Sequence, residues 1–451
     1  MTFKSLRVRA LLAGVAMAAI AGPAAAQIVD NTTPTLVPVP PDPVINPSGK
    51  FSAFDISFAD STLGDIFIGD RSNAGVDIFS GSGLSLITRA GGFAGVQPPP
   101  PAAANNSISG PDGVLTVTSG GVTTLYAGDG NSTLKVFQFT NPANPGGMAA
   151  VISTGGTTRV DEMAYSPASH QVLAANNAET PAFGNLFSTA NGHLPVSLTT
   201  TPGVGIQVPA NQGGIAAGGM EQPAWNPSTT VNGGPSFWVS IPQLGIGGAN
   251  DPGGISQISV TGTVLQTISF NPLLLNGSIS SAGCGPSGLA VAKNGNMLVG
   301  CNTAGPSQAI LVDKNGNFLA AVGKVTSPTN PIGLGGTDEV WYDPTTNKFY
   351  AVGGPGGSNV GTRFFDVIDP NTGMVLQQVD VPTTTSAHSI TVNPLNGDVW
   401  VPIAAGVGCP NGCVAVFAPV PGPVAGAGLS GLILGAGGLI ALARRRRQKI
   451  A

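Results

Sequence analysis

A small set of ionisable side chains occupies equivalent positions in a sequence repeat that recurs along this chain. Each member opens a short apolar run: Asp112, Asp161, Glu221, Asp338 and His388. Three further carboxylates, Asp55, Glu162 and Glu339, stand immediately next to the first position of the same repeat. The whole chain has only 22 acidic residues and three histidines, so this concentration marks a candidate ligand-binding site.

Two interpretations of this acidic set stay open. Carboxylates that crowd together repel one another, which raises their pKa values or attracts a cation. Hard oxygen donors favour Ca²⁺, and a bound divalent ion can activate water for hydrolysis. The simpler interpretation is that polar residues at strand starts satisfy backbone groups and solvate a wet channel mouth.

Several other chemistries are excluded by the sequence. It contains no Gly-x-Ser-x-Gly elbow with triad partners, no His-Glu-x-x-His motif and no Cys-x-x-Cys-His haem attachment. The net charge of −4 and the pI near 5.3 supply no basic surface for nucleic acid, so we exclude nucleic-acid partners.

The elements that must position the acidic set repeat seven times. The opening runs are FDISFAD at 54, DGVLTVT at 112, DEMAYSP at 161, EQPAWNP at 221, SGLAVAK at 287, DEVWYDP at 338 and HSITVNP at 388. A second and a third β-rich run follow each opening run, as DIFIGD at 65 and GVDIFSG at 75 follow the first. Abundant Gly (66) and Pro (39) with only 9% charged residues favour short strands joined by turns.

Alternating strand units repeated four to eight times around an axis make a β-propeller. We therefore predict an all-β fold with a seven-bladed propeller over residues 51–419; six or eight blades are the alternatives. The first strand of each blade should line the central channel, which brings the acidic set to one channel mouth. The tryptophans at 225, 238, 341 and 400 are predicted to pack between blades.

The repeats resemble the YncE/YVTN-like and NHL-like propeller superfamily. The matching elements are AHSITVNP at 387–394 and DVIDPNTG at 366–373. The resemblance implies propeller architecture and leaves the activity open, because proteins of one fold serve many functions. A metal-dependent hydrolase similar to sugar-lactonase propellers is the enzymatic alternative.

Four cysteines, Cys284, Cys301, Cys409 and Cys413, are predicted to form two structural disulfides. Each local pair falls within one predicted hairpin, so we expect Cys284 to bond Cys301 and Cys409 to bond Cys413. An oxidising compartment would permit both bonds.

The two ends of the chain carry targeting patterns. Residues 1–26 combine an early positive region, an apolar stretch and Ala24-Ala25-Ala26, which predicts a signal peptide. Residues 27–50 are Pro-rich and predict an extended lead-in. Residues 424–443 hold no charge and are long enough to span a membrane as a helix. The arginines at 444–447 then place the tail on the cytoplasmic side.

Residues 420–451 also resemble the PEP-CTERM sorting signal of exosortase-processed bacterial proteins. The matching residues are VPGP at 420–423, the apolar stretch and the arginine cluster; Gly422 stands where the usual motif has Glu. The resemblance implies a sorting protease as a partner.

Taken together, the sequence predicts an exported propeller, at the periplasmic face of the inner membrane or at the cell surface. It would act as a binding or scaffold protein for a protein or polysaccharide ligand, and Ca²⁺ is the cofactor of the hydrolase alternative.

Overall fold

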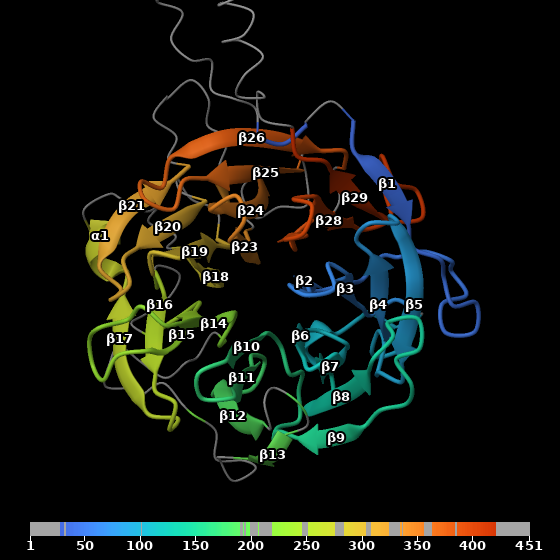
Figure 1. The fold of residues 1–451 in the computed structure, drawn as a ribbon, viewed down its shortest axis with the longest axis horizontal. Helices are drawn as coiled ribbons and strands as arrows, with labels where there is room; N and C mark the ends of the chain where they lie inside the picture. Colours follow the sequence, from blue (N-terminus) through green and yellow to red (C-terminus); the bar gives the residue numbers. More distant parts are fainter. Residues whose placement is uncertain are drawn as a thin grey trace, which may run out of the picture. The chain divides into compact units, whose positions relative to one another are not determined.

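In the computed structural model, the described part of the chain folds as an all-β, seven-bladed β-propeller. The described residues are 28–30, 33–100, 102–189, 193, 195–198, 206, 219–245, 251–275, 284–303, 308–323, 334–335, 337–355, 363–383 and 386–420. Residues Val29–Pro419 form one compact unit. Within it, seven antiparallel sheets are arranged around a central axis, with the first strand of each blade innermost (Figure 1).

The first four blades follow one another along the chain. Blade 1 contains β2 (Ser57–Ala59), β3 (Ile66–Asp70), β4 (Gly75–Ser80) and β5 (Ser85–Gly91). Blade 2 contains β6 (Val114–Ser119), β7 (Val122–Asp129), β8 (Thr133–Phe139) and β9 (Ala150–Ser153). Blade 3 contains β10 (Met163–Ser166), β11 (Gln171–Asn176), β12 (Phe183–Thr189) and β13 (Pro195–Leu198). Blade 4 contains β14 (Pro223–Asn226), β15 (Ser236–Ile241), β16 (Gly254–Ile258) and β17 (Val264–Ser269).

The last three blades complete the circle. Blade 5 contains β18 (Pro286–Val291), β19 (Met297–Cys301), β20 (Ala309–Val312) and β21 (Phe318–Val322). Blade 6 contains β23 (Val340–Asp343), β24 (Lys348–Pro355), β25 (Arg363–Ile368) and β26 (Val375–Val381), and β22 (Leu334–Gly335) pairs with the end of β24. Blade 7 contains β27 (Thr391–Val392), β28 (Val399–Ile403), β29 (Cys413–Phe417) and β1 (Thr35–Pro38). Two short helices, η1 (Asn106–Ile108) and α1 (Asn271–Leu275), lie in connections.

The predicted repeat agrees with these blades: the three β-rich runs of each unit coincide with its first, second and third strands. Turn residues fix where the first strand ends. Asp343 accepts hydrogen bonds from the backbone N–H of Thr345 (2.9 Å) and Thr346 (3.0 Å), which closes the β23–β24 turn. Asx turns of this kind explain why Asp and Asn follow the opening runs.

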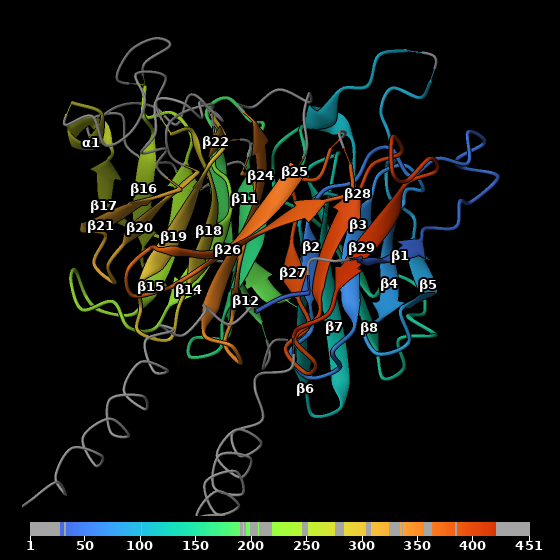
Figure 2. The ribbon, with the colours of Figure 1, turned by 90° about the horizontal axis from the view of Figure 1, so that it is seen from above.

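The ring is closed by the two ends of the propeller. Strand β1 comes from the Pro-rich segment 27–50 and pairs antiparallel with β29, with Val37 opposite Val414. Val37 and Val39 pack in the same apolar cluster as Phe51 and Trp400. Each first strand also contacts the first strands of both neighbouring blades, so these strands form a continuous inner wall. Figure 2 shows the strands running between the two faces of the propeller.

Both predicted cysteine pairs are bonded in the structure. The Cα atoms are 4.6 Å apart in the Cys284–Cys301 bond, which joins the ends of the β18–β19 hairpin, and 6.0 Å apart in the Cys409–Cys413 bond. Among the described residues, no helix has the length and apolar character to cross a membrane. The predicted signal peptide (1–26) and the predicted membrane segment (424–443) fall outside the described residues.

Candidate functional site

A polar cavity of about 390 Å³ lies at one mouth of the central channel. The carboxylates that line it are Asp55, Asp161, Glu162, Glu221 and Asp338, and the basic side chains are Arg71, Arg159, Arg363 and His388. Most of these residues come from the segment just before a first strand. Because first strands start at the same face in every blade, residues far apart in the sequence converge here.

The predicted site residues divide into two groups. Asp161, Glu221, Asp338 and His388 all line the cavity. Asp112 does not: its side chain is fully buried behind Arg71. The structure therefore brings four of the five opening residues to the mouth and makes the fifth a supporting partner.

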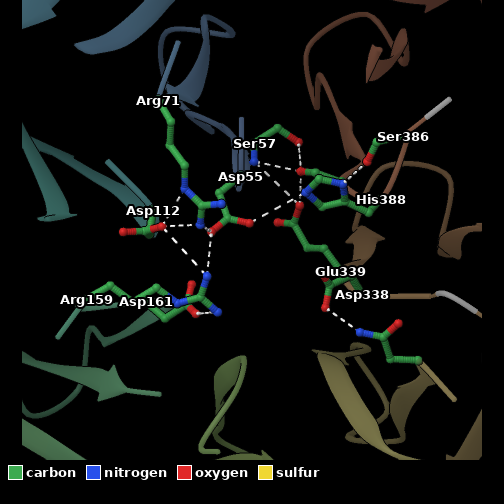
Figure 3. Close-up of polar contacts among 12 residues, drawn as sticks. Asp55, Ser57, Arg71, Asp112, Arg159, Asp161, Asp338, Glu339, Ser386 and His388 are labelled. Carbon is green, nitrogen blue, oxygen red and sulfur yellow. Dashed lines mark hydrogen bonds and ion pairs between the residues drawn. The ribbon is translucent and has the colours of Figure 1, made fainter. Parts of the chain in front are cut away.

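Arg71 links the first and second blades from beneath the cavity. Its guanidinium contacts the carboxylates of both Asp55 and Asp112, and its Nε donates to Asp112 Oδ1 at 2.7 Å (Figure 3). Burial opposes the charged form of Asp55, but Arg71, with His388 and Arg159, holds the pKa of that carboxyl below its usual range. Burial raises the pKa of Asp112 well above its usual range, against the effect of the two arginines.

A second arginine, Arg159, forms an ion pair at the start of the third blade. Arg159 Nη2 lies 2.8 Å from Asp161 Oδ2, and Nη1 lies 3.8 Å from Asp55 Oδ2. Asn177 donates to the same Asp161 oxygen at 2.9 Å. Burial raises the pKa of Asp161 to about 6, since it outweighs the stabilisation by Arg159.

His388 completes the rim on the seventh blade. Its Nδ1 lies 2.7 Å from Ser386 Oγ, and its Nε2 lies 3.6 Å from Asp55 Oδ1. The imidazole stacks on the ring of Phe54, with centroids 4.7 Å apart and planes 3° from parallel. These three contacts fix the ring at the cavity edge.

Three carboxyl groups at the cavity form no salt bridge with another residue that the structure describes. Burial raises the pKa values of Glu162 and Glu221 well above the usual range, and neighbouring carboxylates add to the effect. Burial also raises the pKa of Asp338, whose Oδ1 accepts a hydrogen bond from Asn302 at 3.2 Å. This side of the mouth holds carboxyl groups whose ionised form a bound cation would favour.

Two groups of side chains have the spacing for an ion. The ligand atoms of Asp55, Asp338 and His388 lie within 4.8 Å of one another, and so do those of Asp161, Glu162 and Glu221. In the first group Asp55 is already engaged by Arg71. The second group contains Glu162, whose buried Oε2 accepts no hydrogen bond from the described residues.

Arg71 and Arg159 are the functional residues that the sequence reasoning missed. A signal was available: residues 27–420 contain four arginines, at 71, 89, 159 and 363, and three of them line the mouth. Arg71 follows the second strand β3 and Arg159 precedes the first strand β10, which places both beside the acidic set; Arg363 opens the third strand β25.

The fold and this mouth define the class: a β-propeller with a charged channel entrance. Among solved structures it is similar to the WD40 repeats of RRP9, with a TM-score of 0.54 and 10% identity over 87% of this chain and 99% of that one. It is also similar to Raptor from Chaetomium thermophilum, with a TM-score of 0.52 and 8% identity over 89% of this chain and 30% of that one. At such identities the likeness shows the fold alone. No protein-family model and no curated protein matches the sequence.

Proposed function

We propose that this chain is an exported binding or scaffold propeller whose charged channel mouth receives a basic segment of a protein partner. The observation that carries the proposal is the surplus of carboxylates at the mouth. Arg71 is engaged by Asp55 and Asp112, and Arg159 by Asp161. Glu221 and Asp338 then face the cavity as acceptors for a lysine or arginine.

Charge favours a basic protein segment among the partners that the sequence allowed. A carboxylate-rich concave surface concentrates cations and repels anions. A basic peptide segment therefore fits the mouth better than an acidic polysaccharide does, and charge-assisted hydrogen bonds to carboxylates are the strong kind. WD40-like architecture is consistent with a binding or scaffold role.

The binding test uses the purified full chain, a short oligoarginine peptide and isothermal titration calorimetry. Replacing Glu221 and Asp338 by Gln and Asn should weaken binding at least tenfold. The matched control replaces Asp313 and Asp380, which lie away from the mouth, by Asn. It removes the same charge and should change binding less than threefold. Equal effects of the two pairs would reduce the interaction to net charge and overturn the proposal.

Delivery to the membrane or cell surface is the second part of the proposal. Support comes from the signal-peptide pattern in residues 1–26 and from residues 420–451, which resemble a PEP-CTERM segment read by a sorting protease. A reporter fused at residue 420 should be active outside the cytoplasm, and one fused at 451 should be active inside before processing. A cytoplasmic reporter at 420 would contradict export.

A second candidate function is a Ca²⁺-dependent, lactonase-like hydrolase. The grouping of Asp161, Glu162 and Glu221 favours it, because three carboxylates within 4.8 Å supply hard oxygen donors. Such an ion would activate water beside a bound ester. Stoichiometric Ca²⁺ binding together with lactone hydrolysis that chelator abolishes would establish this activity, and the absence of Ca²⁺ binding would remove it.

A further inference from the structure

The central channel has a second chamber beyond the charged mouth. Its volume is about 380 Å³, and first strands from six blades line it. Five of the lining side chains are aromatic: Phe58, Tyr165, Trp225, Trp341 and Tyr342. Each is only partly buried. Because the acids stand at the starts of the first strands and these rings near their ends, the chamber is acidic toward the mouth and aromatic away from it.

These rings differ from the aromatic residues that pack the blades. Trp238 and Trp400 are fully buried in the core, whereas Trp225 and Trp341 line the chamber. The ring of Phe58 meets that of Trp341 edge-to-face at 5.3 Å.

The two tyrosines of the chamber are held by hydrogen bonds at their hydroxyls. Tyr342 donates to Asn347 Oδ1 at 2.7 Å, and the Tyr165 hydroxyl lies 3.0 Å from His170 Nδ1. The hydroxyls are thus tied to turn residues, and the rings remain as lining.

Glu162 lies where the two cavities adjoin, since it lines both. The equivalent residues of blades 4 and 6 brace neighbouring strands. Gln222 Oε1 accepts from the backbone N–H of Leu289 at 2.6 Å, and Glu339 accepts from the Ser389 hydroxyl. Glu162 is 3% exposed, yet its Oε2 accepts no hydrogen bond from the described residues. Burying a carboxylate oxygen without a hydrogen-bond partner costs free energy, so a ligand that contacts this oxygen would stabilise the protein.

The charges around the chamber indicate whether that ligand is a cation or an anion. Asp161 and Glu221 place two more carboxyl groups beside Glu162: ligand atoms of the three residues lie within 4.8 Å of one another, so the ionised groups repel. A cation would relieve this repulsion. Aromatic faces attract organic cations, most strongly when water is excluded, and a cavity of this size suits a small molecule or a single side chain.

We propose that the aromatic chamber binds an organic ammonium ion, with its charged head beside Glu162 and its carbon substituents against Trp225 and Trp341. The proposal does not rest on the partner assigned to the mouth, because it uses a different chamber. A hard metal ion at Asp161, Glu162 and Glu221 would leave the aromatic lining unused.

The test compares two ligands of the same shape. Choline and 3,3-dimethyl-1-butanol differ in the charge of the quaternary centre. Titration calorimetry of the purified full chain with each ligand, in the presence of chelator, therefore measures how much that charge contributes to the affinity. Choline should bind at least tenfold more tightly than the alcohol.

Three variants test where choline binds. Glu162→Gln should weaken choline binding at least tenfold, and Trp341→Leu should weaken it at least fivefold. Asp380→Asn, on an exposed surface, should leave it unchanged. The proposal is overturned if choline and the alcohol bind equally, if Glu162→Gln leaves choline binding intact, or if Ca²⁺ binds the chelator-free protein while choline does not bind at all.

Discussion

Replacing Arg71 by Met removes the guanidinium that lies nearest to two buried carboxylates; Arg159 lies farther off, 3.8 Å from Asp55 and 3.9 Å from Asp112. The Arg71 side chain is 5% exposed, and those of Asp55 and Asp112 are 9% and 0% exposed. Breaking a buried ion pair by removing one partner costs about 3–5 kcal/mol, because the remaining charge is uncompensated. Unfolding entropy of about 2.1 cal/mol/K per residue gives roughly 0.8 kcal/mol/K for a unit of this size, so the melting temperature should fall by about 4–6 °C.

The pH dependence of this loss tests its cause. Without Arg71 the pKa values of both carboxyls rise in the folded state, so the folded protein binds more protons than the unfolded chain above the ordinary carboxyl pKa. Stability of the variant then falls as pH rises. The deficit against wild type should be smaller at pH 4 than at pH 7, measured by thermal unfolding with circular dichroism.

A triple variant supplies the matched control. When Asp55 and Asp112 are also replaced by Asn, no buried charge is left without a partner, and most of the lost stability should return. A single-variant deficit below about 1 kcal/mol at pH 7, or one that does not change with pH, would refute the assignment of Arg71 as the charge that holds the first two blades together.

Three further predictions concern the blades. Burial raises the pKa of Asp366 from 3.8 to about 7, so the protein loses stability as the pH rises through the range between these two values. Asp366→Asn should therefore stabilise by up to about 4 kcal/mol at pH 8 and add nothing at pH 4, as denaturant titrations at both pH values would show. Val37 of β1 is 1% exposed and its neighbour Leu36 is 42% exposed, so Val37→Asp should open the ring to limited proteolysis near β29 while Leu36→Asp leaves it protected. Replacing Cys284 and Cys301 by Ser should lower stability by about 3 kcal/mol, and non-reducing peptide mapping of wild type should show those two linked to each other.

The inner three strands of each blade could be predicted because they are local. Each one is a short β-rich run bounded by a turn residue, and the repeat places the equivalent residue of every blade at the same face. The fourth strand of blade 7 has no such signal. Strand β1 is a four-residue element within a Pro-rich segment, and only its pairing with β29, almost the whole chain away, makes it a strand.

The site was predictable in its acids and its histidine, and not in its arginines. Asp161, Glu221, Asp338 and His388 share one repeat position and meet at the cavity. Arg71 belongs to no repeat position; its role depends on contacts with Asp112 in the next blade, which are visible only in three dimensions.

The tryptophans show a similar limit of the sequence. All four were predicted to pack between blades, and Trp238 and Trp400 do so. Trp225 and Trp341 also pack against core clusters, but each stands on a first strand, is only partly buried and lines the channel as well.

The central claim is that the charged mouth is the binding surface for a basic partner. A photo-crosslinking residue at Asn302, which is exposed at the mouth, can be compared with one at Asn317, which is exposed on the β20–β21 turn. With a labelled oligoarginine peptide, position 302 should give at least ten times more adduct than position 317, and the Glu221→Gln, Asp338→Asn pair should abolish it. Equal labelling at both positions, or labelling at 302 that survives the loss of both carboxylates, would contradict the account.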